Sequence, residues 1–188
     1  SGDALAFLEQ FEGMEFSEAL KYLADRAGVR LTEWKGQGKA GSMRERLIEI
    51  NHLAAEFYQF LLTQHKVGEI ALDYLKKRGI SSEAIKVFGL GYAANDWEGL
   101  QKFLVGKKGY KQEELELSGL VIKRDRGQGF YDRFRGRIMF PLTEAGGKVV
   151  GFAGRLLDPE VKEAKYVNTP ETQVYHKSEL LYGLSVTR

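Results

Sequence analysis

The stretch RIMFPLTEAGGKVVGFAGRL, residues 137–156, decides the fold. Its two halves, Arg137–Thr143 and Lys148–Leu156, are rich in aliphatic and aromatic residues, and each is predicted to form a strand. Glu144–Gly147 lies between them and ends in two glycines, which predicts a tight turn. Two strands joined by so short a turn pair antiparallel. The sequence therefore predicts a β-hairpin at this point.

Working outward, the chain divides into helices before this hairpin and short strands around it. Leu120–Ile122 and Lys165–Val167 predict two further strands. Upstream, Met43 to about His65 has apolar residues at alternating spacings of three and four, which predicts a long amphipathic helix. Shorter helices are expected over 67–77, over 82–88 and from Asp96 onward. Helices first and strands second indicate an α+β fold, with N-terminal helices followed by a small mixed or antiparallel sheet.

Three regions are expected along the 188 residues. Residues 1–34 contain two short helix patterns and are interpreted as a helical tail. Residues 35–42, KGQGKAGS, have the composition of a flexible linker. Residues 43–188 are expected to form the main domain.

The composition narrows the function class. The sequence has no cysteine, which excludes disulfides, thiolate zinc sites and a cysteine nucleophile. No apolar run approaches 18 residues and no signal-peptide pattern is seen, so no membrane association and a cytoplasmic location are expected. The three histidines show no metal-ligand spacing, and no metal site is predicted.

Charge is concentrated in one segment. The formal net charge is +2, yet residues 121–155 hold eight Lys or Arg against three Asp or Glu. A basic segment on a nearly neutral protein indicates a site for a polyanion. The alternative is a solvated hairpin whose charges have no partner.

Arg133, Arg135 and Arg137 suggest what that site would bind. If they lie on one strand they share a face at a spacing of about 7 Å, close to the spacing of nucleic-acid phosphates. Arginine also binds phosphate oxygens in a bidentate way. At least one of the three is expected to pair internally instead, with Asp132 or Glu144.

Further candidates follow this arginine segment. Arg155 lies at the predicted end of a strand, Lys165 and Lys177 offer charges to phosphate, and Asn168 offers an amide. Tyr166 offers a face for base stacking, which together with cations holds single strands without sequence preference. The alternative is a strand-end arginine in water followed by a polar loop. Trp97 is interpreted as a packing residue.

Several blocks, taken in order, carry a resemblance to a known family. They are residues 131–141 (YDRFRGRIMFP), 151–155 (GFAGR), 165–172 (KYVNTPET), 176–177 (HK) and 181–183 (LYG), with 74–81 (YLKKRGIS) and 88–92 (FGLGY) upstream. Together they resemble the bacterial DnaG-type DNA primase, at the N-terminal part of its RNA polymerase domain. Residues 3–31 resemble the helical tail that follows the zinc ribbon of this family.

The resemblance implies a function. The family makes RNA primers on single-stranded DNA from nucleoside triphosphates and works with the replicative helicase. It implies that Arg78, Arg155, Lys165 and Lys177 help to hold template, primer or nucleotide. Arg135, Arg137 and Asn168 are added to this set by the same resemblance.

The sequence also departs from the family pattern. Ala153, Ala164 and Ser178 replace a usual glycine, proline and glycine, and leave the charged residues intact. The zinc-ribbon ligands and the acidic Toprim segment that binds Mg²⁺ are not found. In the family that segment begins just after the Leu-Tyr-Gly block, and this chain stops at Arg188. No catalytic residue is therefore assigned, and the chain alone is expected to bind nucleic acid without polymerising.

Two alternatives remain open at this stage. One is a single-stranded nucleic-acid-binding module with no enzymatic parent, which would show the same basic sheet. The other is a dinucleotide enzyme, because residues 89–94 match G-x-G-x-x-A. The second is disfavoured because the next helix is expected only at Asp96 and no βαβ pattern follows.

Overall fold

The computed structural model describes residues 39–125 and 127–177. The chain separates into two compact units, Ser1–Ser42 and Met43–Arg188, and apart from residues 39–42 the described residues lie in the second. The predicted helical tail of residues 1–34 lies outside the described residues. No described helix is long and apolar enough to span a membrane.

The first described element is helix α3, Lys39–Thr63, and it corrects one prediction. Residues 35–42 are predicted to be a linker, but the helix takes up Lys39–Ser42. The only glycine in that part, Gly41, falls in the first turn, where backbone N–H groups have no helical partner in any case. A glycine there interrupts few helical hydrogen bonds, so it does not end the helix.

Six short helical elements follow α3 within the described residues. A 3₁₀ turn, η1 (Lys66–Gly68), leads into α4 (Glu69–Lys77), and α5 (Ser82–Val87) begins where the Ser81 hydroxyl accepts a hydrogen bond from the Ala84 N–H at 3.0 Å. Helix α6 (Gly99–Gln101) continues directly as the π-helix η2 (Lys102–Lys107), and α7 (Gln112–Leu117) follows. Helices are thus confirmed at each predicted position from Met43 onward.

The strands form two antiparallel sheets. The larger has the order β1-β4-β5-β6, with β1 (Gly91–Ala93), β4 (Arg137–Thr143), β5 (Val149–Leu156) and β6 (Tyr166–Asn168). The smaller pairs β2 (Val121–Lys123) with β3 (Phe130–Asp132). The predicted α+β fold is confirmed, and the described pairings are all antiparallel. The dinucleotide alternative fails here, because residues 91–93 form a strand of an antiparallel sheet and not the turn of a βαβ unit.

The predicted β-hairpin is confirmed as β4 and β5. Met139 lies opposite Gly154 and Phe140 opposite Ala153. Within the turn, Gly147 has a φ of 79°, a conformation that glycine adopts without strain, and its N–H donates to the Glu144 carbonyl at 2.8 Å.

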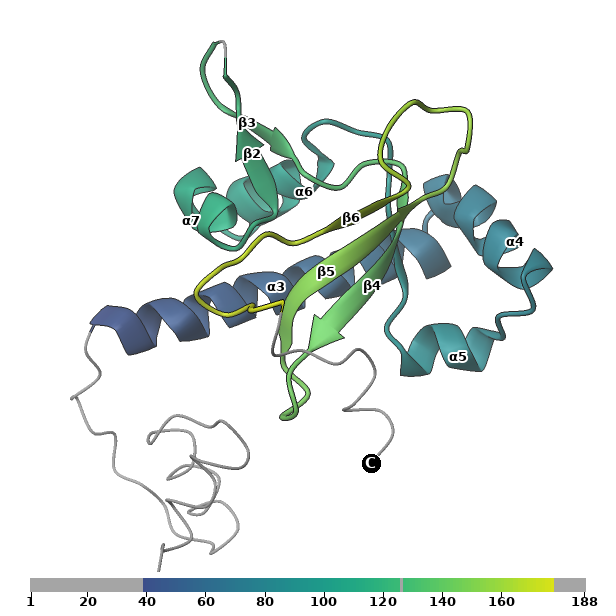
Figure 1. The fold of residues 1–188 in the computed structure, drawn as a ribbon, viewed down its shortest axis with the longest axis horizontal. Coiled ribbons are helices and arrows are strands. Elements are labelled where there is room, and N and C mark those ends of the chain that lie inside the picture. Colours follow the sequence, from purple (N-terminus) through teal and green to yellow (C-terminus); the bar gives the residue numbers. More distant parts are fainter. Residues whose placement is uncertain (1–38, 126, 178–188) are drawn as a thin grey trace, which may run out of the picture. The chain divides into compact units, whose positions relative to one another are not determined.

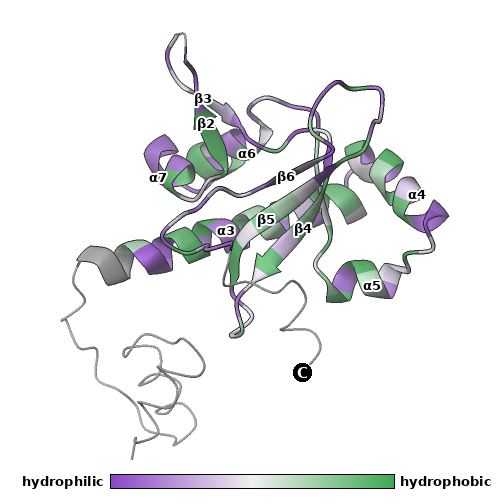
Figure 2. Ribbon diagram, in the orientation of Figure 1, coloured by the Kyte–Doolittle hydropathy of each residue, from purple (hydrophilic) through white to green (hydrophobic). Residues whose placement is uncertain are grey.

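Each face of the larger sheet packs against its own helices (Figure 1). Phe152 and Met139 join Leu47 and Ile50 of α3 in one hydrophobic cluster. Ile138, in contrast, joins residues of α4 and α5 in a second cluster. The helices carry both hydrophobic and hydrophilic residues along their ribbons, as amphipathic helices do (Figure 2). Helices therefore pack on both faces of the sheet, which gives the side chains of its edge strand β6 a rigid support.

Candidate nucleic-acid-binding site

The first group of functional side chains gathers on Tyr74 of α4. Arg155 of β5 donates a hydrogen bond from Nη1 to the Tyr74 hydroxyl, and its guanidinium lies 5.0 Å from the centre of the Tyr74 ring. Arg78 lies 5.4 Å from the centre of the same ring. It follows Tyr74 by one helical turn, at the end of α4, so the two side chains lie on one face of the helix.

The two arginines change the acidity of the tyrosine. Burial raises the pKa of the Tyr74 hydroxyl, but the hydrogen bond and charge of Arg155, and those of Arg78, outweigh it and lower the pKa below its usual value. The same hydrogen bond raises the pKa of Arg155. Arg155 therefore keeps its full charge, since a neutral hydroxyl accepts its hydrogen bond without neutralising it.

Strand β6 adds two residues beside this pair. Tyr166 lies directly opposite Arg155 in the β5–β6 register, and 59% of its surface is exposed. The Lys165 amine lies 5.8 Å from the centre of the Tyr166 ring. We call Tyr74, Arg78, Arg155, Lys165 and Tyr166 the Tyr74 cluster. Asn168 is exposed two residues further along β6, so its side chain points to the same side of the strand as that of Tyr166.

A second group forms around Glu163. Arg137 donates from Nη2 to the Glu163 carboxylate at 2.9 Å and from Nη1 to the Ala164 carbonyl at 2.8 Å. Arg135 places its Nη2 at 3.7 Å from the other oxygen of the same carboxylate. We call Arg135, Arg137 and Glu163 the Glu163 cluster. It fixes the residues just before Lys165.

The predicted row of three arginines on one strand face is wrong. Strand β4 begins only at Arg137, and Gly136 has a φ of 59°, which takes the preceding residues out of the sheet. Arg133 instead donates to the Gly119 carbonyl at 2.8 Å. Internal pairing does occur, but through Glu163 and the Asp132 carbonyl and not through the predicted carboxylates.

A third group, which the sequence interpretation missed, surrounds Trp97. The Arg135 guanidinium lies 4.2 Å from the centre of the Trp97 ring and 5.3 Å from that of Tyr131. Arg124 lies 5.7 Å from the centre of the Tyr131 ring. Trp97 is 53% exposed, so it is not the packing residue that was predicted. Its neighbours Asp96 and Glu98 are the only sequence signal that it lies outside the core. We call Trp97, Tyr131, Arg124 and Arg135 the Trp97 platform.

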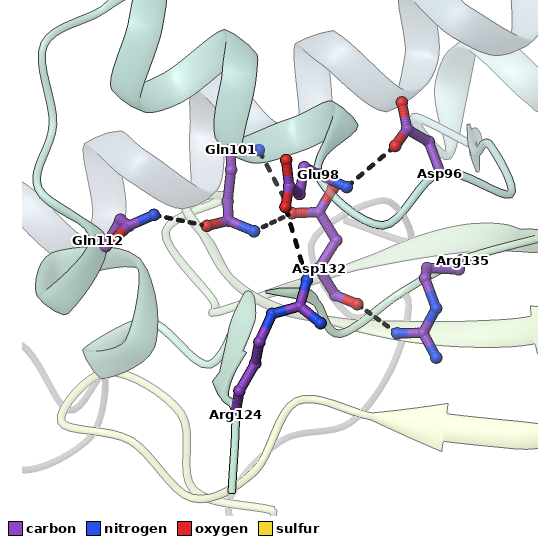
Figure 3. A network of polar contacts seen from close by, with 7 residues as sticks. All are labelled: Asp96, Glu98, Gln101, Gln112, Arg124, Asp132 and Arg135. Atoms are coloured by element: carbon purple, nitrogen blue, oxygen red, sulfur yellow. Dashed lines mark hydrogen bonds and ion pairs between the residues drawn. The ribbon is translucent and has the colours of Figure 1, made fainter. Parts of the chain in front are cut away.

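A buried carboxylate, that of Asp132, belongs to a polar network that also contains Arg124 and Arg135 of the platform (Figure 3). Asp132 accepts hydrogen bonds from the Leu100 N–H at 2.7 Å and from the backbone and side-chain N–H groups of Gln101, both at 3.3 Å. It thus caps the first turn of α6, which begins at Gly99 and not at Asp96. Burial, opposed by these hydrogen bonds, raises the pKa of Asp132 to about 6. The Asp132 N–H donates to the Trp97 carbonyl at 2.8 Å, which ties the tryptophan to β3.

The last predicted residue, Lys177, ends the described part of the chain. Its backbone N–H donates to the Glu171 carboxylate at 3.0 Å, and its side chain is exposed. The loop before it is anchored by Thr169, which is buried and bonds to Phe152 of β5. Among the described residues the amine of Lys177 forms no ion pair, so its charge is available to a ligand.

The structure therefore brings together Arg78, Arg155 and Lys165, with Asn168 on the neighbouring strand surface. It places Arg135 and Arg137 in a different, acid-containing group. No group of three or more His, Asp or Glu side chains suited to a metal ion occurs within residues 39–125 and 127–177.

Comparisons with known proteins agree on one family. A family model described as the N-terminal domain of the DNA primase catalytic core matches residues 57–188. The chain is 43% identical over its whole length to a DNA primase of Deinococcus radiodurans, covering 31% of that protein, and 38% identical to one of Streptomyces coelicolor, covering 29%. The chain thus spans about 30% of the length of these curated relatives.

Solved structures give the same answer. The RNA polymerase domain of Mycobacterium tuberculosis primase DnaG matches with a TM-score of 0.69 and 40% identity, over 76% of this chain and 45% of that one. A DnaG primase catalytic domain bound to single-stranded DNA matches with a TM-score of 0.68 and 37% identity, over 78% and 44%. The Aquifex aeolicus primase, comprising zinc-binding and RNA polymerase domains, matches over 98% of this chain and 42% of that one, with 29% identity and a TM-score of 0.67.

Proposed function

Because this chain belongs to the bacterial DnaG-type DNA primase family, we propose that it supplies the surface that holds nucleic acid during primer synthesis. Its ligands would be the single-stranded DNA template, the RNA primer and the nucleoside triphosphates. The observation that carries the proposal is the Tyr74 cluster, where three cations meet two aromatic rings and no acid of the described residues takes part.

The chemistry of that cluster suits a single strand. Arg155, Arg78 and Lys165 offer charge to backbone phosphates, and arginine does so in a bidentate way. The exposed ring of Tyr166 offers a face on which a base can stack, and Asn168 adds a polar contact beside it. Lys177 contributes a further charge from the loop after β6.

The roles of Arg135 and Arg137 are revised in this proposal. Only 2% of the Arg137 side chain is exposed and it bonds to the Ala164 carbonyl, so we assign it to positioning the segment that carries Lys165 while Glu163 covers it. Arg135 stacks on Trp97, and 53% of that tryptophan is open to a base. Trp97 is therefore added to the proposed binding residues as a second stacking platform.

We propose that other parts of the whole protein carry out the reaction itself. Nucleotidyl transfer needs metal-bound carboxylates to stabilise developing charge. We propose that the family's Toprim segment supplies them with Mg²⁺, and that its zinc ribbon holds Zn²⁺. We also propose that the whole protein works with the replicative helicase and is located in the cytoplasm.

Binding of labelled oligo(dT) at several salt concentrations tests the proposal. Affinity is expected to fall with salt, with a log–log slope of about −0.7 for each phosphate neutralised. An affinity that does not depend on salt would contradict it. Primer synthesis is then compared between this chain and one extended through a Toprim segment. Binding by both with synthesis only by the longer chain is expected, whereas the alternative of a binding module without enzymatic parent predicts synthesis by neither.

A further inference from the structure

Glu163 occupies an unusual place between two arginines. One of its carboxylate oxygens lies 2.9 Å from Arg137 Nη2, and the other lies 3.7 Å from Arg135 Nη2. The two guanidinium side chains are only 2% and 13% exposed, whereas the Glu163 side chain is 44% exposed. The carboxylate therefore lies on the solvent side of two nearly buried cations and covers them.

We propose that Arg135 and Arg137 form a subsite for one backbone phosphate, and that Glu163 is an internal competitor which a bound strand displaces from it. This inference rests on the proposed function and adds to it a regulation of the same surface. A phosphodiester, like a carboxylate, presents two anionic oxygens on one central atom. It can therefore take the two positions that the Glu163 oxygens hold now.

The subsite keeps its shape when Glu163 leaves. Arg137 remains bonded to the Ala164 carbonyl at 2.8 Å, and Arg135 remains bonded to the Asp132 carbonyl at 2.5 Å and stacked on Trp97. Both guanidiniums are thus held by neutral groups as well as by the acid. Without the carboxylate they present two charges that no other described acid compensates.

Glu163 is also free to move without disturbing the sheet. It lies in the irregular segment between β5 and β6, whose residues 158–165 are exposed. The strand pairs resume only at Tyr166, and Leu156 bonds to the Lys165 carbonyl at 2.8 Å independently of the Glu163 side chain. A change of side-chain rotamer is enough to open the subsite.

The position of the subsite fits a nucleotide. Arg135 belongs both to the Glu163 cluster and to the Trp97 platform. A base stacked on Trp97 would therefore have its backbone beside the guanidinium that Glu163 now covers. Competition by Glu163 would weaken binding of isolated phosphate ions more than binding of a strand, because a strand can stay bound through stacking and other phosphates while the subsite is covered.

Glu163→Gln tests this inference, with Glu160→Gln as a matched control. Glutamine keeps an oxygen that accepts from Arg137 but loses the charge. Glu160 lies in the same exposed segment and forms no ion pair with a described residue, so its replacement changes the net charge equally. Binding of labelled oligo(dT) is measured at several salt concentrations, with inorganic phosphate as a competitor and thermal unfolding as a check on folding.

Glu163→Gln is expected to bind oligo(dT) about fivefold to tenfold more tightly than the unmodified chain. Its salt slope should change little, because the bound strand neutralises the same phosphates in both chains once Glu163 has been displaced. Phosphate should compete better against the variant than against the unmodified chain. Glu160→Gln should change affinity by much less.

Two results would overturn the inference. If Glu163→Gln binds no more tightly than Glu160→Gln, Glu163 does not compete with phosphate. If Glu163→Gln and Glu163→Ala both weaken binding while remaining folded, Glu163 positions Lys165 and does not compete. The proposed function fails separately, when the unmodified chain itself shows no salt-dependent binding.

Discussion

The Tyr74 cluster and the Glu163 cluster each contain two arginines, and they differ in the group that holds them. In the first, the hydroxyl and ring of Tyr74 hold Arg155 and Arg78 without cancelling their charge. In the second, the Glu163 carboxylate accepts from Arg137 and lies close to Arg135. A tyrosine thus orients an arginine for a ligand, whereas a carboxylate orients it and neutralises it. Similar arginines in one basic stretch of sequence therefore have different availability.

The largest expected effect concerns the stability that the Glu163 cluster provides. Arg137→Ala should lower the free energy of unfolding by about 3 kcal/mol, because it removes a buried side chain that bonds to both the Glu163 carboxylate and the Ala164 carbonyl. Arg78→Ala, at an exposed helix end, should change it by less than about 0.5 kcal/mol. Urea unfolding of both variants measures the difference. An unfolding midpoint of Arg137→Ala equal to that of the unmodified chain would contradict the structural role given to the Glu163 cluster.

The next effect concerns binding by the Tyr74 cluster. Arg155→Ala should weaken oligo(dT) binding by about 2 kcal/mol, roughly 30-fold, because a charge-assisted contact to phosphate is lost. Arg155→Lys should recover part of the affinity, since lysine keeps the charge but not the planar fork. Fluorescence anisotropy titrations give both values. An unchanged affinity in Arg155→Ala would show that the cluster serves only the fold.

A smaller effect concerns Asp132, the buried acid that bonds to Arg135 through its carbonyl. Its pKa is raised to about 6 in the folded state, so the folded chain takes up a proton more readily than the unfolded one. The contribution of Asp132 to stability therefore grows as pH falls through 6, by about 1 kcal/mol between pH 7 and pH 5. Thermal unfolding of Asp132→Asn should lack this part of the pH dependence. Parallel pH profiles of the variant and the unmodified chain would contradict the assignment.

The smallest effect concerns Lys177, which stands apart from both clusters. Lys177→Ala should weaken oligo(dT) binding by about threefold and make the salt slope shallower by about 0.7, as expected for one lost phosphate contact. Lys162→Ala is the control. Lys162 is also exposed, its loss changes the net charge equally, and it belongs to none of the three groups defined above. A slope that is the same in Lys177→Ala as in the unmodified chain would remove Lys177 from the site.

Sequence reasoning succeeds here wherever the signal is local. The alternation around residues 137–156 and the glycines at 146 and 147 specify the hairpin, and β2 and β6 fall within one residue of their predicted bounds. Strands β1 and β3 are missed, since three residues between turns carry no periodicity.

Contacts between distant residues explain the other misses. Tyr74 meets Arg155 across 81 residues, and Glu163 meets Arg137 across 26. Which arginine gains an acid depends on how the loop before β6 folds back, and no spacing rule contains that information. The assignment of Arg155 and Lys165 to the site stays a prediction that their grouping supports.

The Thr169 side chain, which anchors the loop before Lys177, has a consequence for hydrogen exchange. The Phe152 amide donates to the Thr169 hydroxyl at 2.8 Å, while the Thr169 amide donates to the Phe152 carbonyl at 2.8 Å. A side-chain oxygen thus replaces a backbone acceptor one residue past the end of β6. Exchange at Phe152 then reports on the opening of the loop and not on the opening of the sheet. The exchange rate of the Phe152 amide, in the middle of β5, therefore measures how often the loop that leads to Lys177 opens.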